Sequence, residues 1–210
     1  MRQASLGAFV LRTFLWLPVC FGAWYLASHY ISAAAAAVAS LFVHGFAPGI
    51  VSAIEHPGVE LAFVTTIEVL GAPGRAAFLV PEVNPLAYTY GLALFAALML
   101  ATRSRWWQLL AGASLLMLFA GWGIAFDFLA HVGIKLGPAI AHEAGIVGWR
   151  RELIALGYQM GVLVLPGLAP IALWAVFNRA FIARATRRSR SGGLLDGHGG
   201  EERHGALDRR

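Results

Sequence analysis

Apolar residues along this chain gather in four long stretches, separated by shorter segments that carry the charges. A helix that crosses a hydrocarbon core of about 30 Å needs roughly 20 mainly apolar residues. Windows of that kind, free of Asp, Glu, Lys and Arg, occur at about residues 13–31, 85–102, 106–126 and 153–177. The pattern therefore predicts a mainly α-helical polytopic membrane bundle of about four transmembrane helices, with residues 1–183 forming one membrane domain.

A fifth apolar stretch, residues 33–54, follows the first with almost no turn between them. We interpret it as a continuation of the first helix or as an interfacial helix, broken near Gly45 and Pro48, and leave open whether it spans the membrane. A cleaved signal peptide is the competing account of the N-terminus, since Arg12, an apolar run and small residues superficially fit one. The length of the apolar run argues against cleavage.

Positively charged residues decide the number of spans. Cytoplasmic loops of membrane proteins carry an excess of Lys and Arg. With four spans and a cytoplasmic N-terminus all three basic groups fall inside, whereas a fifth span would put the last two outside. We therefore predict four spans with both termini in the cytoplasm. The basic groups are Arg2 with Arg12, Arg103 with Arg105, and the cluster from Arg179 to Arg190.

Residues 59–80 show a different periodicity. From Val59 to Val69 the odd positions are mostly apolar with polar residues between them, which is the period of two typical of a half-buried strand. Turn residues follow, and residues 76–80 can form a returning strand. Because unpaired strand amides cannot lie in lipid, we predict a small extracytoplasmic β-hairpin at or above the membrane surface.

The composition supports a lipid environment, since 59% of the residues are hydrophobic and 13% are charged. The formal charge of +5 does not indicate a nucleic-acid partner, because half of the sixteen basic residues lie at or beyond Arg179, beside an apolar span. Residues 184–210 lack apolar periodicity after Leu195, so we predict a disordered basic cytoplasmic tail. The sequence indicates no cofactor and leaves the oligomeric state open.

Cys20, the only cysteine, lies within the first predicted span. A single cysteine excludes an intrachain disulfide and a cysteine metal cluster. A nucleophilic cysteine needs a nearby base or positive charge, and no charged residue lies within seven positions on the same helix. We favour an inert packing role and leave open activation by a residue of another helix.

His131, His142 and Glu143 offer nitrogen and carboxylate groups on one predicted outside loop, and three such ligands can bind zinc. The His-Glu pair does not belong to an H-E-x-x-H motif, because no histidine occupies the second position of that motif. Hydrogen bonding at a wet surface is the commoner role of such residues, so we predict no metal site.

Asp127 lies near the outer end of the third predicted span, and we expect it to be either a functional group or one half of an ion pair with Arg150 or Arg151. Gly157 and Gly161 form a G-x-x-x-G pattern on the fourth span, at the spacing that lets helix backbones approach closely. Packing inside the bundle is the expected role of the pair, and contact with another membrane protein is the alternative.

Two segments, FLWLPVCFGAWYLASHY at residues 14–30 and VNPLAYTYGLALFAALMLA at residues 83–101, resemble the exosortase H-associated membrane protein family. Members of that family are small polytopic proteins encoded with bacterial protein-sorting transpeptidases. The resemblance covers the first half of the chain. It implies a multi-pass protein of the bacterial inner membrane, with an exosortase-like enzyme as its membrane protein partner.

In this resemblance the Asn84-Pro85 step, followed by Tyr88, Tyr90 and Gly91, marks the entry to the second span. Proline is tolerated in the first turn of a helix, asparagine can cap the free amides, and tyrosines suit the interface. The candidate functional or interaction residues are thus Asn84, Pro85, Tyr88, Tyr90, Gly91, Asp127, Gly157 and Gly161.

Exosortases use a membrane-associated cysteine with arginine and histidine, and Cys20 does not fall in that pattern. The resemblance therefore implies an accessory protein, not itself an enzyme, that acts by contact with the sorting enzyme or its substrate. The alternative is an intramembrane hydrolase or transpeptidase that uses Cys20 or the group of His131, His142 and Glu143. A small transporter ranks third, because no span contains a central charge.

Overall fold

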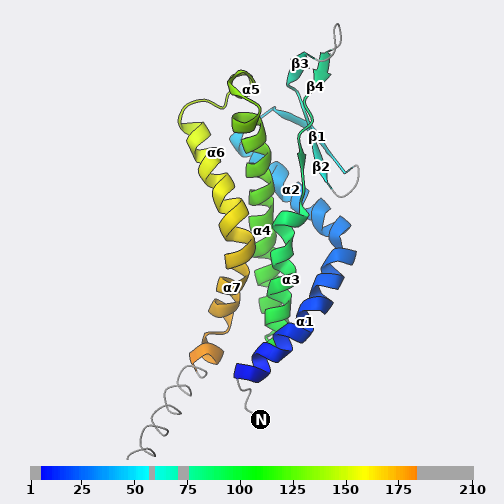
Figure 1. Cartoon of the computed structure of the whole chain (residues 1–210), viewed down its shortest axis with the longest axis vertical. Helices are drawn as coiled ribbons and strands as arrows, with labels where there is room; N and C mark the ends of the chain where they lie inside the picture. Colours follow the sequence, from blue (N-terminus) through cyan, green and yellow to red (C-terminus); the bar gives the residue numbers. More distant parts are fainter. Residues whose placement is uncertain (1–5, 57–59, 71–75, 184–210) are drawn as a thin grey trace, which may run out of the picture.

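The computed structural model describes residues 6–56, 60–70 and 76–183 and is mostly helical (Figure 1). The helices are α1 (Leu6–Leu26), α2 (Ser28–Phe46), α3 (Leu86–Ala101), α4 (Trp106–Ala130), the π-helix η1 (His131–Lys135), α5 (Pro138–Glu143), α6 (Trp149–Gln159), the π-helix η2 (Met160–Val164) and α7 (Leu165–Phe177). The strands are β1 (Val51–Glu55), β2 (Leu61–Thr65), β3 (Glu68–Leu70), β4 (Ala76–Phe78) and β5 (Glu82–Val83). The predicted fold class is confirmed. The predicted tail, residues 184–210, and the turn of the predicted hairpin, residues 71–75, lie outside the described residues.

α1 and α2 form one long helical run with a bend at Ala27. The backbone N–H of Ala27 donates to the Ala23 carbonyl at 3.0 Å, and the N–H of Ile31 donates to the Ala27 carbonyl at 3.1 Å, so hydrogen bonding continues across the bend. α1 packs against α3, and α2 packs against α4. The stretch 33–54, expected to be helical with a break near Gly45 and Pro48, is a helix up to Phe46 and then the strand β1 from Val51. The helix ends where the break was expected, but the strand was not expected.

The chain runs up, down, up and down along the long axis of the molecule (Figure 1). The run α1–α2 leads to the sheet, α3 returns, α4 leads back, and α6 to α7 return again. Both ends of the described chain therefore lie opposite the sheet and α5. By length and apolar composition four helices could cross a membrane, and α3 is shorter. Those four are Gly7–Leu26, Ser28–Phe46, Trp106–Lys135 and Trp149–Phe177.

The third long helix runs further than its apolar pattern predicted. α4 continues into η1, so the helix extends over 30 residues from Trp106 to Lys135, whereas the predicted span ended at residue 126. Its sheet-side half is enclosed by α2, the sheet and α6. That packing stabilises a helix in a segment whose polar residues had indicated a loop. The segment 127–152 is therefore mostly helical.

The strands form two small antiparallel units. β1, β2 and β5 pair in the order β1-β2-β5, and β3 pairs with β4. The predicted first strand of the hairpin is divided into β2 and β3 at Thr66 and Ile67, and the chain returns through β4 and β5. The edge strand β1 was not predicted. It follows soon after an apolar helix, and its five residues are too few to show an alternating pattern distinct from that helix.

Two packed regions hold the molecule together. Near the sheet, Phe63 of β2 stacks on Phe128 of α4 with ring centroids 4.4 Å apart, and both rings are fully buried. At the other end, α3 lies between α1 and α7, with Phe95 fully buried. Full burial of one such aromatic side chain contributes about 1.5–3 kcal/mol, so the sheet is anchored firmly to the bundle.

Candidate functional site

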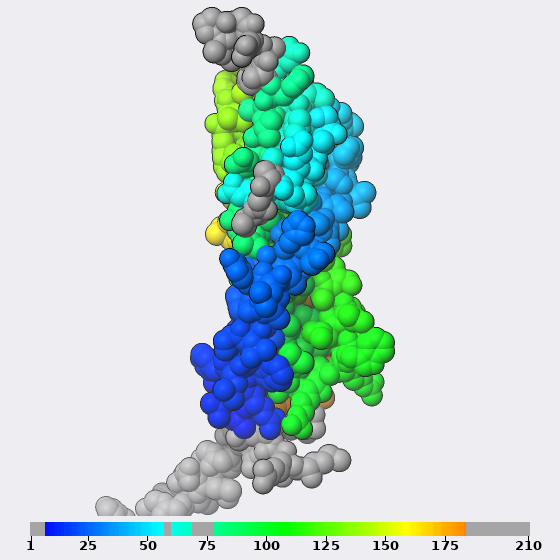
Figure 2. Space-filling model, turned by 90° about the vertical axis from the view of Figure 1, so that its right-hand side faces the viewer, coloured from blue at the N-terminus to red at the C-terminus, as the bar shows by residue number. Residues whose placement is uncertain are grey.

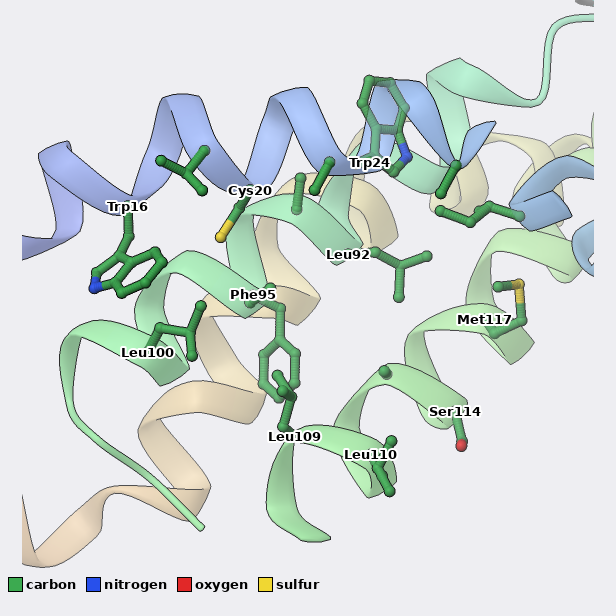
Figure 3. A pocket seen from close by; sticks show the side chains of 17 residues that line it. Trp16, Cys20, Trp24, Leu92, Phe95, Leu100, Leu109, Leu110, Ser114 and Met117 are labelled. Carbon is green, nitrogen blue, oxygen red and sulfur yellow. The ribbon is translucent and has the colours of Figure 1, made fainter. Parts of the chain in front are cut away.

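An apolar groove lies between α1 and α4, with α3 as its floor (Figure 3). Its volume is about 810 Å³, within the range of roughly 300–1,000 Å³ typical of small-molecule sites. In Figure 2 a hollow separates α1, in dark blue, from the green helix beside it. The lining side chains are nearly all apolar and come from three helices. They include Trp16, Cys20 and Trp24 of α1, Leu92, Phe95 and Leu100 of α3, and Leu109, Leu110, Ser114 and Met117 of α4.

Cys20 lies on the wall of this groove (Figure 3). It packs with Ala93 and Ala97 of α3 in a cluster that contains no charged side chain. A thiolate needs a nearby positive charge or base, and none contacts the sulfur among the residues that the structure describes. The geometry therefore favours the packing role of this cysteine.

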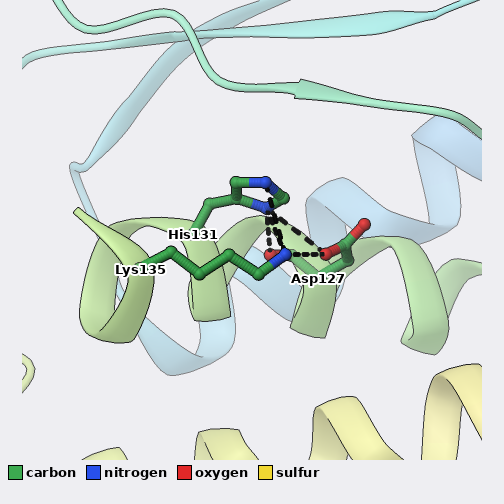
Figure 4. Close-up of polar contacts among 3 residues, drawn as sticks. All are labelled: Asp127, His131 and Lys135. Atoms are coloured by element: carbon green, nitrogen blue, oxygen red, sulfur yellow. Dashed lines mark hydrogen bonds and ion pairs between the residues drawn. The ribbon is translucent and has the colours of Figure 1, made fainter.

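A charged cluster lies on the last turns of α4 and on η1 (Figure 4). Lys135 Nζ donates to Asp127 Oδ1 at 3.3 Å, and His131 Nδ1 lies 3.3 Å from the same oxygen. His131 Nδ1 is also 2.9 Å from the Asp127 carbonyl. A carbonyl can only accept, so Nδ1 carries a proton in this geometry. The cluster neutralises a carboxylate whose side chain is only 13% exposed.

Two tyrosines complete the surroundings of the cluster. Lys135 Nζ lies 5.0 Å from the ring centroid of Tyr158 on α6, within reach of a cation–π interaction. The buried Tyr88 at the start of α3 lies close enough to Asp127 for a direct electrostatic interaction. Three helices thus converge on one carboxylate near the sheet end of the bundle.

The expected pairing of Asp127 with Arg150 or Arg151 is wrong. Both arginines are exposed on the first turn of α6, and the Asp127 carboxylate forms its ion pair with Lys135 instead. Lys135 reaches it because α4 continues into a π-helix, which places position 135 two turns beyond Asp127 on the same face. Lys135 could have been identified from the sequence as the partner of Asp127 only if the helix had been predicted to continue through residue 135.

The three residues considered as metal ligands do not come together as a site. His142 and Glu143 are exposed on α5, while His131 is engaged with Asp127. In residues 6–56, 60–70 and 76–183 there is no group of three or more His, Cys, Asp or Glu side chains arranged to hold a metal ion.

The entry motif of α3 stabilises the start of that helix. Asn84 Oδ1 accepts a hydrogen bond from the Leu86 backbone N–H at 2.9 Å, as an N-terminal cap does. The buried Pro85 carbonyl accepts from the N–H groups of Tyr88 and Thr89 at 3.1 Å each. Tyr88 is buried, so it does not lie at a wet surface as expected for an interfacial tyrosine.

The remaining motif residues set close approaches between helices. A Cβ on Gly91 would lie 2.7 Å from the Pro166 carbonyl oxygen of α7, and one on Gly161 would lie 2.8 Å from Gly123 Cα of α4. A Cβ on Gly157 would overlap the Phe126 ring. The Tyr90 hydroxyl faces α7 close to Gly167. These small residues are used inside the bundle, so contact with a partner must use other surfaces.

The fold and these sites define a multi-pass membrane protein whose small and polar motif residues join its own helices and which holds an apolar groove between three of them. The chain belongs to the exosortase H-associated membrane protein family, whose sequence pattern matches residues 3–181. The match confirms the resemblance seen in the first half and extends it over most of the chain. No curated protein and no solved structure matches this chain.

Two features of the site escaped sequence analysis. The groove needs α1 to stand away from α4, which no local pattern reveals, although Trp16, Cys20, Ala23 and Ala27 share one helix face. The role of Lys135 needs the π-helical continuation of α4. A carboxylate and a lysine eight positions apart, both at the apolar end of a helix, are the only signal of it.

Proposed function

We propose that this protein is a non-catalytic accessory component of a bacterial exosortase-type protein-sorting system. It acts in the inner membrane by direct contact with an exosortase H-type enzyme. The observation that carries the proposal is the family match over residues 3–181, since the family is described as membrane proteins associated with exosortase H. The proposal includes a topology in which both termini lie in the cytoplasm and the sheet lies on the extracytoplasmic side of the inner membrane.

The chemistry of the described residues supports an accessory role. Cys20 is surrounded by apolar groups. His131 Nδ1 donates to Asp127, its Nε2 can accept from Lys135 Nζ at 3.4 Å, and no hydroxyl or thiol among the described residues is bonded to the ring. A nucleophile next to a base is the minimum for covalent catalysis. The rival hypothesis, an intramembrane cysteine or histidine enzyme, lacks that pair.

The helix with the most free apolar surface is α1. In the most apolar 18-residue window of α1, 6% of the residues are buried, against 44% in the corresponding window of α4 and η1. Leu11, Phe14 and Leu15 are each more than 60% exposed. We place the contact with the enzyme on this outward face of α1.

Co-purification tests the proposal directly. The tagged protein is isolated in mild detergent from cells that also express the exosortase H-type enzyme of the same bacterium, with a photo-crosslinking residue at Leu15 or, as the matched control, at Leu168 on the exposed face of α7. We expect a crosslink to the enzyme from position 15 and not from position 168. Recovery of no sorting enzyme from either position would overturn the proposal.

Catalysis by this chain is tested separately. Cys20→Ser and His131→Ala are compared with the unchanged protein in a sorting assay at equal protein levels. An accessory role predicts unchanged sorting by Cys20→Ser, because that residue only packs. Loss of sorting by Cys20→Ser with the enzyme still bound would favour the intramembrane enzyme instead.

A further inference from the structure

Among the described residues, the end of the bundle opposite the sheet carries only positive charges, whereas the sheet end carries charges of both signs. Arg12 on α1 and the loop arginines Arg103 and Arg105 lie at the end opposite the sheet, as Arg179 does beyond α7. The ion pairs within the described part of the chain do not include any of them. The carboxylates of that same part lie at the sheet end: Glu55, Glu60, Glu68, Glu82, Asp127, Glu143 and Glu152.

Three of these arginines stand where the groove ends. Leu100 and Leu109 line the groove, and the loop that joins them carries Arg103 and Arg105. Arg12 precedes Trp16 by four residues, so it lies on the same face of α1 as the groove wall. The apolar groove therefore leads to a group of three positive charges.

The loop is built around an arginine in an uncommon backbone conformation. Arg103 has φ of +53°, and it is the only residue other than glycine with positive φ among those described. Such a conformation is rare for a non-glycine residue and is usually filled by Gly, Asn or Asp. The turn it makes places Arg103 and Arg105 together in the short loop between α3 and α4.

The groove is long enough to hold much of an acyl chain within one lipid leaflet. One wall runs from Trp16 on α1 to Ile31 near the start of α2, and the other runs from Leu109 to Met117 on α4. These stretches are about 22 Å and about 12 Å of helix. One leaflet contributes half of a hydrocarbon core about 30 Å thick. The exposed Trp106 next to the arginines is the kind of residue that sits at headgroup level.

We propose that this groove is a binding site for an anionic phospholipid. An acyl chain lies between α1 and α4, and the phosphate group lies at Arg12, Arg103 and Arg105. Charge selects this occupant over others. A partner helix would bring its own basic cytoplasmic end to the three arginines, and a zwitterionic headgroup carries a cation of its own. The inference is independent of the exosortase partner.

Lipid binding to the purified full-length protein tests the proposal. Native mass spectrometry measures binding of phosphatidylglycerol and of phosphatidylcholine with identical acyl chains. We expect a clear preference for phosphatidylglycerol. The double variant Arg103→Gln/Arg105→Gln should weaken its binding about 25-fold, because each arginine near an anionic headgroup contributes about fivefold. Arg150→Gln/Arg151→Gln, at the sheet end, is the matched control and should change binding little.

A second pair of variants tests where the acyl chain lies. Ala113→Leu and Ser114→Phe fill the groove from α4 without changing any charge, and thermal unfolding reports whether each remains folded. Both should reduce binding of phosphatidylglycerol, while the same type of change at Leu168→Phe on α7 should not. Equal binding of the two lipids, equal loss in both arginine pairs, or unchanged binding by the filled groove would each overturn the proposal. If the variants with a filled groove no longer co-purify with the enzyme but still bind phosphatidylglycerol, the groove is a site for a partner helix instead.

Discussion

At the residue scale, Asp127 shows how a carboxylate is kept within a mostly apolar bundle. Its side chain is 13% exposed and is paired with Lys135 and His131. Removing one partner from a buried pair leaves an uncompensated charge, which costs more than the pair contributes. The Asp127–Lys135 pair is partly exposed, so breaking it costs less stability than breaking a fully buried pair.

Lys135→Met should therefore destabilise the protein, by about 1–2 kcal/mol between the surface and buried limits for ion pairs. Asp127→Asn in the same chain should restore part of that loss, because no charge is then left unpaired. Thermal unfolding in detergent measures both. Arg150→Met, which removes an exposed arginine, is the control and should leave stability nearly unchanged.

A second carboxylate prediction concerns pH. A hydrogen bond with Glu82 and repulsion from its charge raise the pKa of Glu60 above the ordinary value. The folded protein then holds this proton more tightly than the unfolded chain, so the contribution to stability is full below the ordinary pKa of about 4.3 and is lost as pH rises through the raised pKa. Glu82→Gln should flatten this part of the stability profile, measured by unfolding temperature between acid and neutral pH. A profile identical to that of the unchanged protein would contradict the assignment.

At the element scale, glycines set how closely helices approach. The Cβ of an alanine at position 161 would lie 2.8 Å from Gly123 Cα, and the backbone of α4 cannot move away as a side chain could. At position 167 the nearest atom is the Tyr90 hydroxyl oxygen at 3.7 Å, an ordinary contact. The two glycines therefore differ although both lie on the same continuous helical run.

Gly161→Ala should lower the free energy of unfolding by about 1–3 kcal/mol, the cost of overpacking a close contact. Gly167→Ala should be neutral or slightly stabilising, because alanine has the higher helix propensity. Unfolding of the two variants in the same detergent compares them directly. Equal stability would show that α4 and the α6–α7 run separate at no cost.

At the scale of the whole molecule, the bundle has one end with the sheet and one end with both termini of the described chain (Figure 1). The arginines of the second end agree with a cytoplasmic location, and the unpaired edge of β1 requires water or protein rather than lipid. The orientation proposed for the membrane follows from these two constraints together.

Labelling of single cysteines tests this orientation. In a Cys20→Ser background, Ser52→Cys on β1 should react with a membrane-impermeant maleimide added to spheroplasts. Arg105→Cys should react only after the membrane is opened. Both positions are exposed, so access and not burial decides the result. Reaction of both from the same side would contradict the topology.

Sequence alone predicted the helices whose patterns are long and uniform, and it predicted the family. It also identified Asn84 as a side chain that binds a free amide at the start of α3, since the hydrogen bond with Leu86 is local. It ended the third helix too early because residues 127–135 are polar on one face. That face is polar because it carries the Asp127 cluster, while the opposite face is buried by α2, the sheet and α6.

The amino-acid sequence by itself determined that this protein enters a membrane, how its positive charges are divided and where α3 and α4 begin. Those properties depend on apolar length, local capping and charge, which act over a few residues. Only the tertiary structure decided that Lys135 serves Asp127, that the glycines face other helices of the same chain, and that α1 stands away from α4. Each depends on which segments far apart in the chain pack together. The groove and its arginines thus belong to the assembled bundle rather than to any one helix.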